Sequence, residues 1–115
     1  MENNIIFICP SWEDRSLLGF EQDYNDVKIS KVIAIRKEHP INELEISDCI
    51  DKITNICTQQ AITYEEIIWK DNPSKNSEQL SSCLNKLNTN DIVHIDITTM
   101  PRDILVSKIH RYISL

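Results

Sequence analysis

Glycine is the scarcest structural residue in this chain, because Gly19 is the only one among 115 residues. Dinucleotide-binding fingerprints and P-loops need several glycines, since their backbone N–H groups must close on phosphate groups. Sites of both kinds are therefore excluded. Basic residues are also few, with 12 Lys and Arg against 18 Asp and Glu and a net charge of −6. Broad binding of duplex DNA needs a basic face, so the composition argues against it.

Cysteine pairs and long apolar runs are absent as well. The four cysteines, Cys9, Cys49, Cys57 and Cys83, include no Cys-x-x-Cys pair, so the usual spacing of a zinc site or a thioredoxin motif is missing. No stretch approaches the roughly 20 apolar residues of a membrane span. Met1–Asn4 carries no basic residue, which argues against a signal peptide at the start of this sequence. We therefore expect mostly buried free thiols in a cytoplasmic, reducing setting, with no membrane contact and no metal or other cofactor.

Isoleucine and short apolar runs dominate what is present. Twenty isoleucines against two alanines favour buried β-structure built from branched side chains. Four apolar runs are continuous rather than alternating, which is typical of parallel strands that are covered on both faces. The runs are Ile5–Cys9, Val32–Ile35, Ile67–Trp69 and Ile92–Ile97.

Between these runs lie stretches with the spacing of amphipathic helices. Ser11 followed by Asp14 resembles a capping box and predicts a helix over about Trp12 to Gln22. Three apolar stripes predict the other helices: Ile46, Cys49, Ile50, Ile53, Ile56 and Cys57; Leu80, Cys83, Leu84 and Leu87; and Ile104, Leu105, Ile109, Tyr112 and Ile113. The alternation predicts an α/β fold, a three-layer Rossmann-like sandwich whose parallel sheet has about four strands in the order 3-2-1-4, with helices on both faces.

The chain has the length of one domain, so we expect residues 1–115 to form a single Rossmann-like unit. The last apolar stripe runs to Leu115, which is what the first domain of a longer protein would show. In open α/β sheets, ligands bind at the carboxyl ends of the strands where the strand order reverses. The order 3-2-1-4 puts this crevice between the first and fourth strands.

Two loops that this topology brings together are rich in functional side chains. They are Cys9–Arg15 and Asp96–Asp103. Hydroxyl groups near a helix start, together with free N–H groups, attract anions, and arginine forks suit phosphate oxygens. We therefore expect a phosphate-bearing ligand. The predicted ligand-binding residues are Ser11, Trp12, Glu13, Arg15, Asp96, Thr98, Thr99 and Arg102.

Structural roles compete with these assignments. The hydroxyl residues also suit helix caps, and each arginine also suits a surface ion pair. Asp96, at the end of an apolar run, either holds a ribose hydroxyl, or accepts hydrogen bonds from the backbone of the neighbouring loop or pairs with an arginine there. His94 is expected to be a hydrogen-bonded core residue rather than a general base. Cys9 is expected to serve packing rather than nucleophilic attack, and Trp12 suits either base stacking or a hydrophobic staple.

The segment Ile92–Leu105, a strand followed by Asp-x-Thr and a tight loop into an apolar helix, resembles the late signature of CARF domains. These are Rossmann-like nucleotide sensors of CRISPR and related antiviral defence systems. The segment Ile5–Arg15 looks like the other half of such a pocket, and Arg102 would take the basic role of the family's loop. The resemblance implies a homodimer that binds a cyclic oligonucleotide second messenger and relays the signal to an effector domain beyond Leu115.

Two other classes remain open. Asp96–Thr99 is similar to the Asp-x-x-Thr-Thr loop with which phosphoribosyltransferases grip a sugar phosphate, and a related fold serves nucleoside-processing enzymes. A phosphoribosyltransferase-like, nucleosidase-like or nuclease-like enzyme would need a competent base at this crevice. A non-catalytic domain whose acidic surface meets a protein partner also fits the composition.

Overall fold

A computed structural model describes residues 3–11, 28–38, 40–96 and 104. The described elements are, in chain order, β1 (Asn3–Ile8), β2 (Ile29–Lys37), α2 (Glu43–Gln59), β3 (Thr63–Trp69), α3 (Pro73–Asn85) and β4 (Asp91–Ile95). The helix predicted over Trp12 to Gln22 lies outside the described residues, as does the last predicted stripe apart from Ile104.

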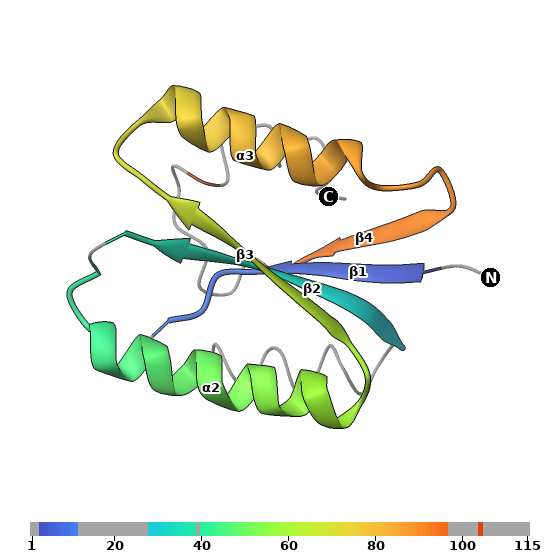
Figure 1. Ribbon diagram of the computed structural model, residues 1–115, viewed down its shortest axis with the longest axis horizontal. Coiled ribbons are helices and arrows are strands. Elements are labelled where there is room, and N and C mark those ends of the chain that lie inside the picture. The colour runs from blue at the N-terminus through green and yellow to red at the C-terminus, as the bar shows by residue number, and fades with distance from the viewer. Residues whose placement is uncertain (1–2, 12–27, 39, 97–103, 105–115) are drawn as a thin grey trace.

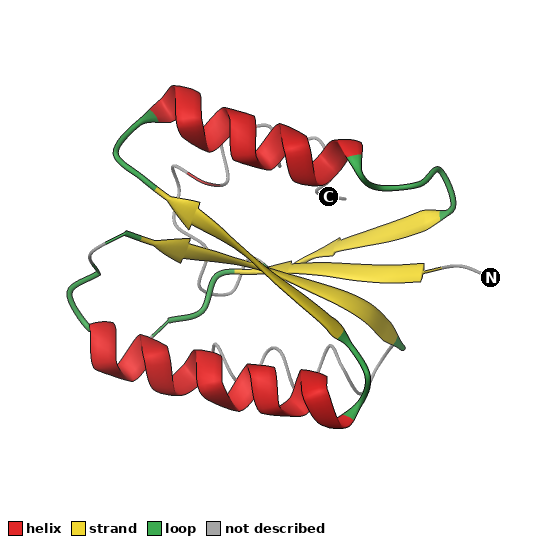
Figure 2. Ribbon diagram, in the orientation of Figure 1, coloured by secondary structure: helices red, strands yellow, loops and turns green. Residues whose placement is uncertain are grey.

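The four strands form one parallel sheet. β1 lies between β2 and β4, and β3 pairs with β2, so the strand order is β3-β2-β1-β4. This confirms the predicted α/β fold and the order 3-2-1-4. Helices α2 and α3 cover opposite faces of the sheet, which therefore forms the middle layer (Figures 1 and 2).

Continuous apolar runs form the central strands because both faces of the sheet are covered. Side chains alternate between the two faces along a strand. In β1, Ile5 and Phe7 join the core on the side of α3, whereas Ile6 and Ile8 join the core on the side of α2. Any polar residue within this run would therefore be buried against one helix or the other.

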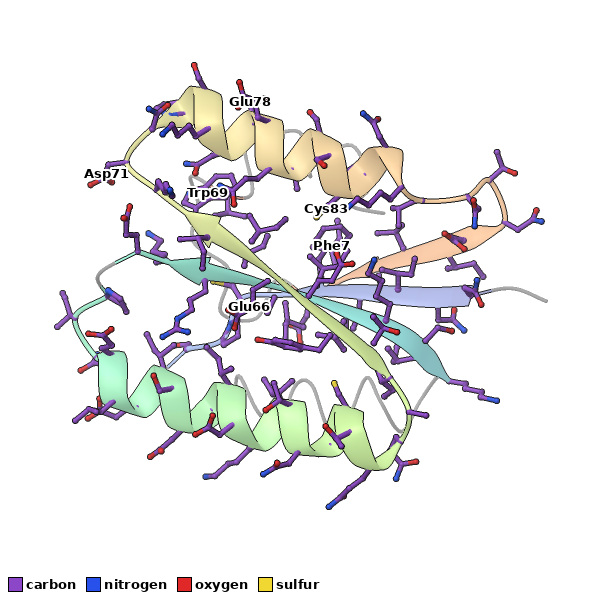
Figure 3. The ribbon with its side chains drawn as sticks, in the orientation of Figure 1. Phe7, Glu66, Trp69, Asp71, Glu78 and Cys83 are labelled. Atoms are coloured by element: carbon purple, nitrogen blue, oxygen red, sulfur yellow. The ribbon has the colours of Figure 1, made fainter. Side chains whose placement is uncertain are left out.

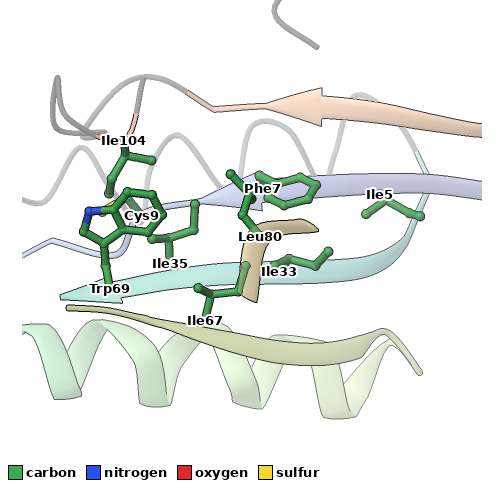
Figure 4. Packing of buried hydrophobic residues seen from close by; sticks show 9 residues of the cluster. All are labelled: Ile5, Phe7, Cys9, Ile33, Ile35, Ile67, Trp69, Leu80 and Ile104. Carbon is green, nitrogen blue, oxygen red and sulfur yellow. The ribbon is translucent and has the colours of Figure 1, made fainter. Parts of the chain in front are cut away.

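The core on the α3 side centres on Phe7 and Leu80, both fully buried. Figure 4 shows the side chains of this cluster gathered along the strands, with Leu80 among them. Its buried members are Ile5, Phe7, Cys9, Ile33, Ile35, Ile67, Trp69, Leu80 and Ile104. Ile104 belongs to the stripe predicted near the end of the chain, and it is fully buried here.

The core on the α2 side joins the middle strands to the apolar stripe of α2. The predicted stripe is confirmed, because its members Ile46, Cys49, Ile50, Ile53 and Cys57 are buried and Ile56 packs against the same cluster. Burying a large aliphatic side chain fully contributes about 1.5–3 kcal/mol. This stripe is therefore the main attachment of α2 to the sheet.

The carboxyl end of α2 turns through Ala61, which adopts a left-handed conformation with φ of 57°. The N–H of Ile62 donates to the carbonyl of Cys57 at 2.8 Å, and the N–H of Gln60 donates to the carbonyl of Ile56 at 3.0 Å. The first of these bonds is the six-to-one bond of a Schellman motif. Glycine usually occupies the left-handed position, because a Cβ atom is unfavourable there.

The amino end of α3 follows the predicted turn at Asp71–Ser74. Pro73 is the first residue of the helix, and the Asn72 side chain accepts a hydrogen bond from the N–H of Lys75 at 3.1 Å. Both features are ordinary helix-start signals. In the part of the chain that the structure describes, neither helix has the length and apolar character needed to span a membrane.

Strands β2 and β3 are longer than their apolar runs predicted. The runs were Val32–Ile35 and Ile67–Trp69, whereas the strands span Ile29–Lys37 and Thr63–Trp69. Charged residues extend both strands, with Lys31 Nζ at 2.9 Å from Glu65 Oε1 and Arg36 at 4.0 Å from Glu66. Cross-strand pairs of opposite charge stabilise neighbouring strands, which a search for apolar runs does not detect.

Candidate functional site

The carboxyl ends of β1 and β4 meet at the point where the strand order reverses. From β1 the chain steps outward to β2 and β3, and α3 then returns it across the sheet to β4 on the other side of β1. All four strands are parallel, so their carboxyl ends share one edge. The predicted crevice position is therefore present in the described topology.

Asp96 follows β4 directly and is fixed to β1 by its backbone. Its N–H donates to the carbonyl of Phe7 at 3.0 Å, which extends the β1–β4 ladder one residue beyond the last strand pair, Phe7 with Ile95. The residue is half-buried. The backbone of Asp96 is therefore held to β1 at the edge of the sheet where the strand order reverses.

Ser11 lies on the segment that follows β1. Cys9 and Pro10, which precede it, are buried, and Ser11 itself is half-buried. Ser11 and Asp96 thus follow the ends of two neighbouring strands. The other predicted ligand-binding residues lie outside the described residues: Trp12, Glu13, Arg15, Thr98, Thr99 and Arg102.

His94 lies within β4 and is bound to the amino half of β1. Its Nε2 atom is 3.0 Å from Oδ1 of Asn4, and the ring is partly buried. The expected hydrogen bond is present, but His94 is only partly buried and belongs to neither core cluster, so the expected core position is not found. Because Asn4 lies near the start of β1, the bond directs His94 toward the amino half of the sheet and away from the crevice edge.

The four cysteines are free thiols, as expected from their spacing. Cys9 packs in the α3-side core with a relative exposure of 6%, which confirms its packing role. Burial raises the pKa of the Cys57 thiol from 9.0 to about 11. Burial, with the nearby Glu65 carboxylate, also raises the pKa of Cys83. Raised pKa values reduce the thiolate fraction, so Cys57 and Cys83 are poor nucleophiles at neutral pH.

Metal coordination has no basis in the described part of the chain. Across residues 3–11, 28–38, 40–96 and 104, no three His, Cys, Asp or Glu side chains gather as a metal ion would require. Asp91 at the start of β4 instead serves local structure, because its carboxylate accepts from the N–H of Asn88 at 2.8 Å and from the side chain of Asn3 at 3.4 Å.

A second group of polar side chains, which was not predicted from the sequence, lies at the outer edge of β3. Gln79 of α3 hydrogen-bonds to the backbone of Ile68 in this strand, and Asn76 of α3 hydrogen-bonds to the backbone of Lys70, which follows the strand directly. Beyond them an open groove of about 460 Å³ runs between α3 and β3, lined by Glu65, Glu66, Ile67, Glu78, Gln79, Ser82, Cys83 and Lys86. The sequence signal for this feature was the pair Asn76 and Gln79. These amide residues are three apart and lie beside the apolar stripe that begins at Leu80, so they share one side of the helix.

Comparisons with family models, curated proteins and solved structures give no match to this chain. The CARF resemblance therefore rests on the two loop segments alone. The fold and the reversal of strand order between β1 and β4 are the structural observations that bear on function.

Proposed function

We propose that this chain is a Rossmann-like domain that binds a nucleotide-type anionic ligand at the carboxyl ends of β1 and β4. The supporting observation is the reversal of strand order at this point, with Ser11 and Asp96 following the two strand ends. Ligands of open α/β sheets bind at such a position, because the loops diverge there and leave a crevice.

The proposed contacts divide between phosphate and sugar. Hydroxyl groups of Ser11, Thr98 and Thr99 donate hydrogen bonds to phosphate or ribose oxygens. Arg15 and Arg102 neutralise phosphate charge through paired N–H groups. Glu13 and Asp96 bind ribose hydroxyls or orient the arginines, and Trp12 stacks on the base. These residues are Ser11, Trp12, Glu13, Arg15, Asp96, Thr98, Thr99 and Arg102.

The CARF resemblance gives this proposal its more specific form. In that form the chain is a sensor module of an antiviral defence system, and two copies bind one cyclic oligonucleotide across their two-fold axis. Binding is then relayed to an effector domain. Association of the two copies would increase with ligand, since a ligand held by both copies stabilises the dimer by mass action.

Calorimetric titration tests the proposal. The probes are AMP, ribose 5-phosphate and a series of cyclic oligoadenylates, each added to the folded chain. We expect at least one probe to bind, and Arg102→Ala to weaken it about tenfold or more, since a charge-assisted contact contributes about 1.5–3 kcal/mol. Lys86→Ala is the matched control, because it removes one positive charge at the far end of α3.

Two results would contradict the proposal. One is that no probe binds to protein that is folded by circular dichroism. The other is that Lys86→Ala weakens binding as much as Arg102→Ala, since a general charge effect would then explain the change. Turnover of a bound probe that is lost in Asp96→Asn while binding persists would instead identify an enzyme.

A further inference from the structure

β3 is an edge strand, and the backbone groups of alternate residues point away from the sheet. The carbonyl of Trp69 faces β2, because it accepts from the N–H of Glu38 at 2.9 Å. Residues of a strand face alternate sides in the plane of the sheet. Ile68 and Lys70 therefore present their N–H and C=O groups outward, as do Glu66 and Tyr64 farther from the end of the strand. Such a row is a template for another strand.

Two side-chain amides of α3 occupy this row. Gln79 accepts from the N–H of Ile68 at 3.2 Å and donates to the carbonyl of Ile68 at 2.8 Å. Asn76 accepts from the N–H of Lys70 at 2.8 Å and donates to the carbonyl of Lys70 at 2.6 Å. A primary amide offers one donor and one acceptor side by side, as a peptide group of a neighbouring strand does. The two amides thus pair with these backbone groups as two residues of an adjacent strand would.

The helix reaches the edge only near the β3–α3 loop. From that loop α3 and β3 spread apart (Figure 1), and the amide nearer the loop is the shorter asparagine while the farther one is the longer glutamine. The next residues along this side of α3, Ser82 and Cys83, line the open groove. Figure 3 shows Cys83 on the α3 side of the sheet and Glu66 on the opposite side.

The sequence of β3 makes its edge suited to pairing with a second copy of itself. Thr63–Trp69 is rich in β-branched and aromatic residues, which favour strands. An antiparallel pair centred on Ile68 is two-fold symmetric and places Glu66 opposite Lys70 of the partner subunit, twice. Opposite charges directly across a strand pair are stabilising. Asn76 and Gln79 occupy the backbone groups of Ile68 and Lys70, which this pair would use.

We propose that Asn76 and Gln79 form an edge cap, which keeps β3 from pairing with β3 of a second copy of this chain. The cap acts by satisfying the outward N–H and C=O groups of Ile68 and Lys70 within the same molecule. Association through this edge would be independent of any ligand, so the test below stands apart from the crevice.

The test compares the parent chain with N76A/Q79A by sedimentation equilibrium over a range of concentrations. We expect the average mass of the double variant to rise toward twice that of the parent. Adding K70E places like charges opposite each other and should reverse the association. Adding E66K to that triple variant restores opposite charges and should recover it. Asn85→Ala is the control. Asn85 is an exposed residue of α3, so this substitution removes a side-chain amide but leaves the hydrogen bonds to Ile68 and Lys70 in place.

Removing the buried Asn76 can unfold the chain, so Gln79→Ala provides a second route through a half-buried position. Hydrogen exchange should show the Ile68 amide losing protection about tenfold or more, while the Lys70 amide keeps it. The proposal is overturned if a folded variant with an exposed Ile68 amide keeps the parent mass at every concentration. It is equally overturned if association occurs but does not respond to K70E, since another surface would then be responsible.

Discussion

The two faces of the sheet hold their helices by different means. α2 contributes five buried residues to its face, all of them isoleucine or cysteine with exposures of 0–9%. α3 contributes two, Leu80 and the polar Asn76. Apolar burial is non-directional. The four hydrogen bonds from the side-chain amides of α3 to the backbone of Ile68 and Lys70, in contrast, fix the helix at one position along the strand. The α2 face therefore depends on packing volume, and the α3 face depends also on the register of its hydrogen bonds.

The largest expected effect breaks the packing of the α2 face. Ile53 is fully buried at the centre of the α2 stripe. We expect Ile53→Ala to lower the free energy of unfolding by about 3–4 kcal/mol, because it removes buried methyl groups and leaves a cavity. Urea denaturation monitored by circular dichroism gives this value.

The position compared with it on the α3 face is Leu84, which is only half-buried and packs against the cluster that contains the fully buried Leu80. Leu84→Ala should cost only about 1–2 kcal/mol, since solvent already reaches the site and relaxes the cavity. Equal losses at the two positions would mean that both helices are held mainly by apolar burial, contrary to the comparison.

A smaller effect should appear at alkaline pH and should belong to the α2 face. Burial raises the pKa of Cys57 to about 11 from 9.0, and burial followed by the hydrogen bond to Glu66 raises the pKa of Tyr64. The unfolded chain releases these protons first as pH rises. The stabilising contribution of the Cys57 thiol is therefore fully present below about pH 9 and is lost between about pH 9 and 11.

From Cys57 alone we expect a loss of about 1.4 kcal/mol between about pH 7 and pH 10. Urea titrations at the two pH values measure it. Cys57→Ala removes the titrating group, so the difference between the two pH values should shrink by this amount in the variant. An unchanged difference would show that Cys57 does not contribute.

The smallest effect should be stabilising and concerns the end of α2. Ala61→Gly relieves the left-handed position of an alanine, and we expect a gain of about 0.5–1 kcal/mol after the added flexibility of the unfolded chain is counted. Thermal denaturation should show a midpoint higher by about 2–4 °C. The control is Ala34→Gly at a fully buried position of β2, which should lower the free energy of unfolding. A lower midpoint for Ala61→Gly would contradict the Schellman geometry.

The parallel pairing of the strands was predictable because the apolar runs are continuous and the connections are long enough for parallel crossovers. The order 3-2-1-4 followed from the Rossmann-like arrangement assumed for these strands. The stripe from Ile46 to Cys57 identified the face of α2 for the same physical reason. The extent of β3 was not predictable in this way. Its first four residues, Thr63–Glu66, are polar or aromatic and are held by ion pairs to Lys31 and Arg36 on the next strand. Such partners are 30 or more residues away in sequence and become visible only after folding.

The candidate site was predictable only to the level of strand ends. Topology indicated that Ser11 and Asp96 follow neighbouring strands, and the structure agrees. The hydrogen bond from Asp96 to Phe7 was not predictable, because it depends on the register between β1 and β4. The amides of Asn76 and Gln79 escaped notice since a polar residue on a helix is ordinarily solvent-facing. The ligand-binding roles of all eight predicted residues, Ser11 and Asp96 included, stay predictions.

The position of β1 has a consequence for how the chain matures. β1 precedes the other described strands in the chain, yet it is one of the two central strands, and its pairing with β4 joins Asn3 to Asp91. No hairpin brings any two of the described strands together locally, so every pairing closes a long loop. During synthesis the second edge of β1 stays uncovered until β4 has been made. The apolar strand that anchors the finished core is thus also the one that is exposed longest to aggregation and to chaperones.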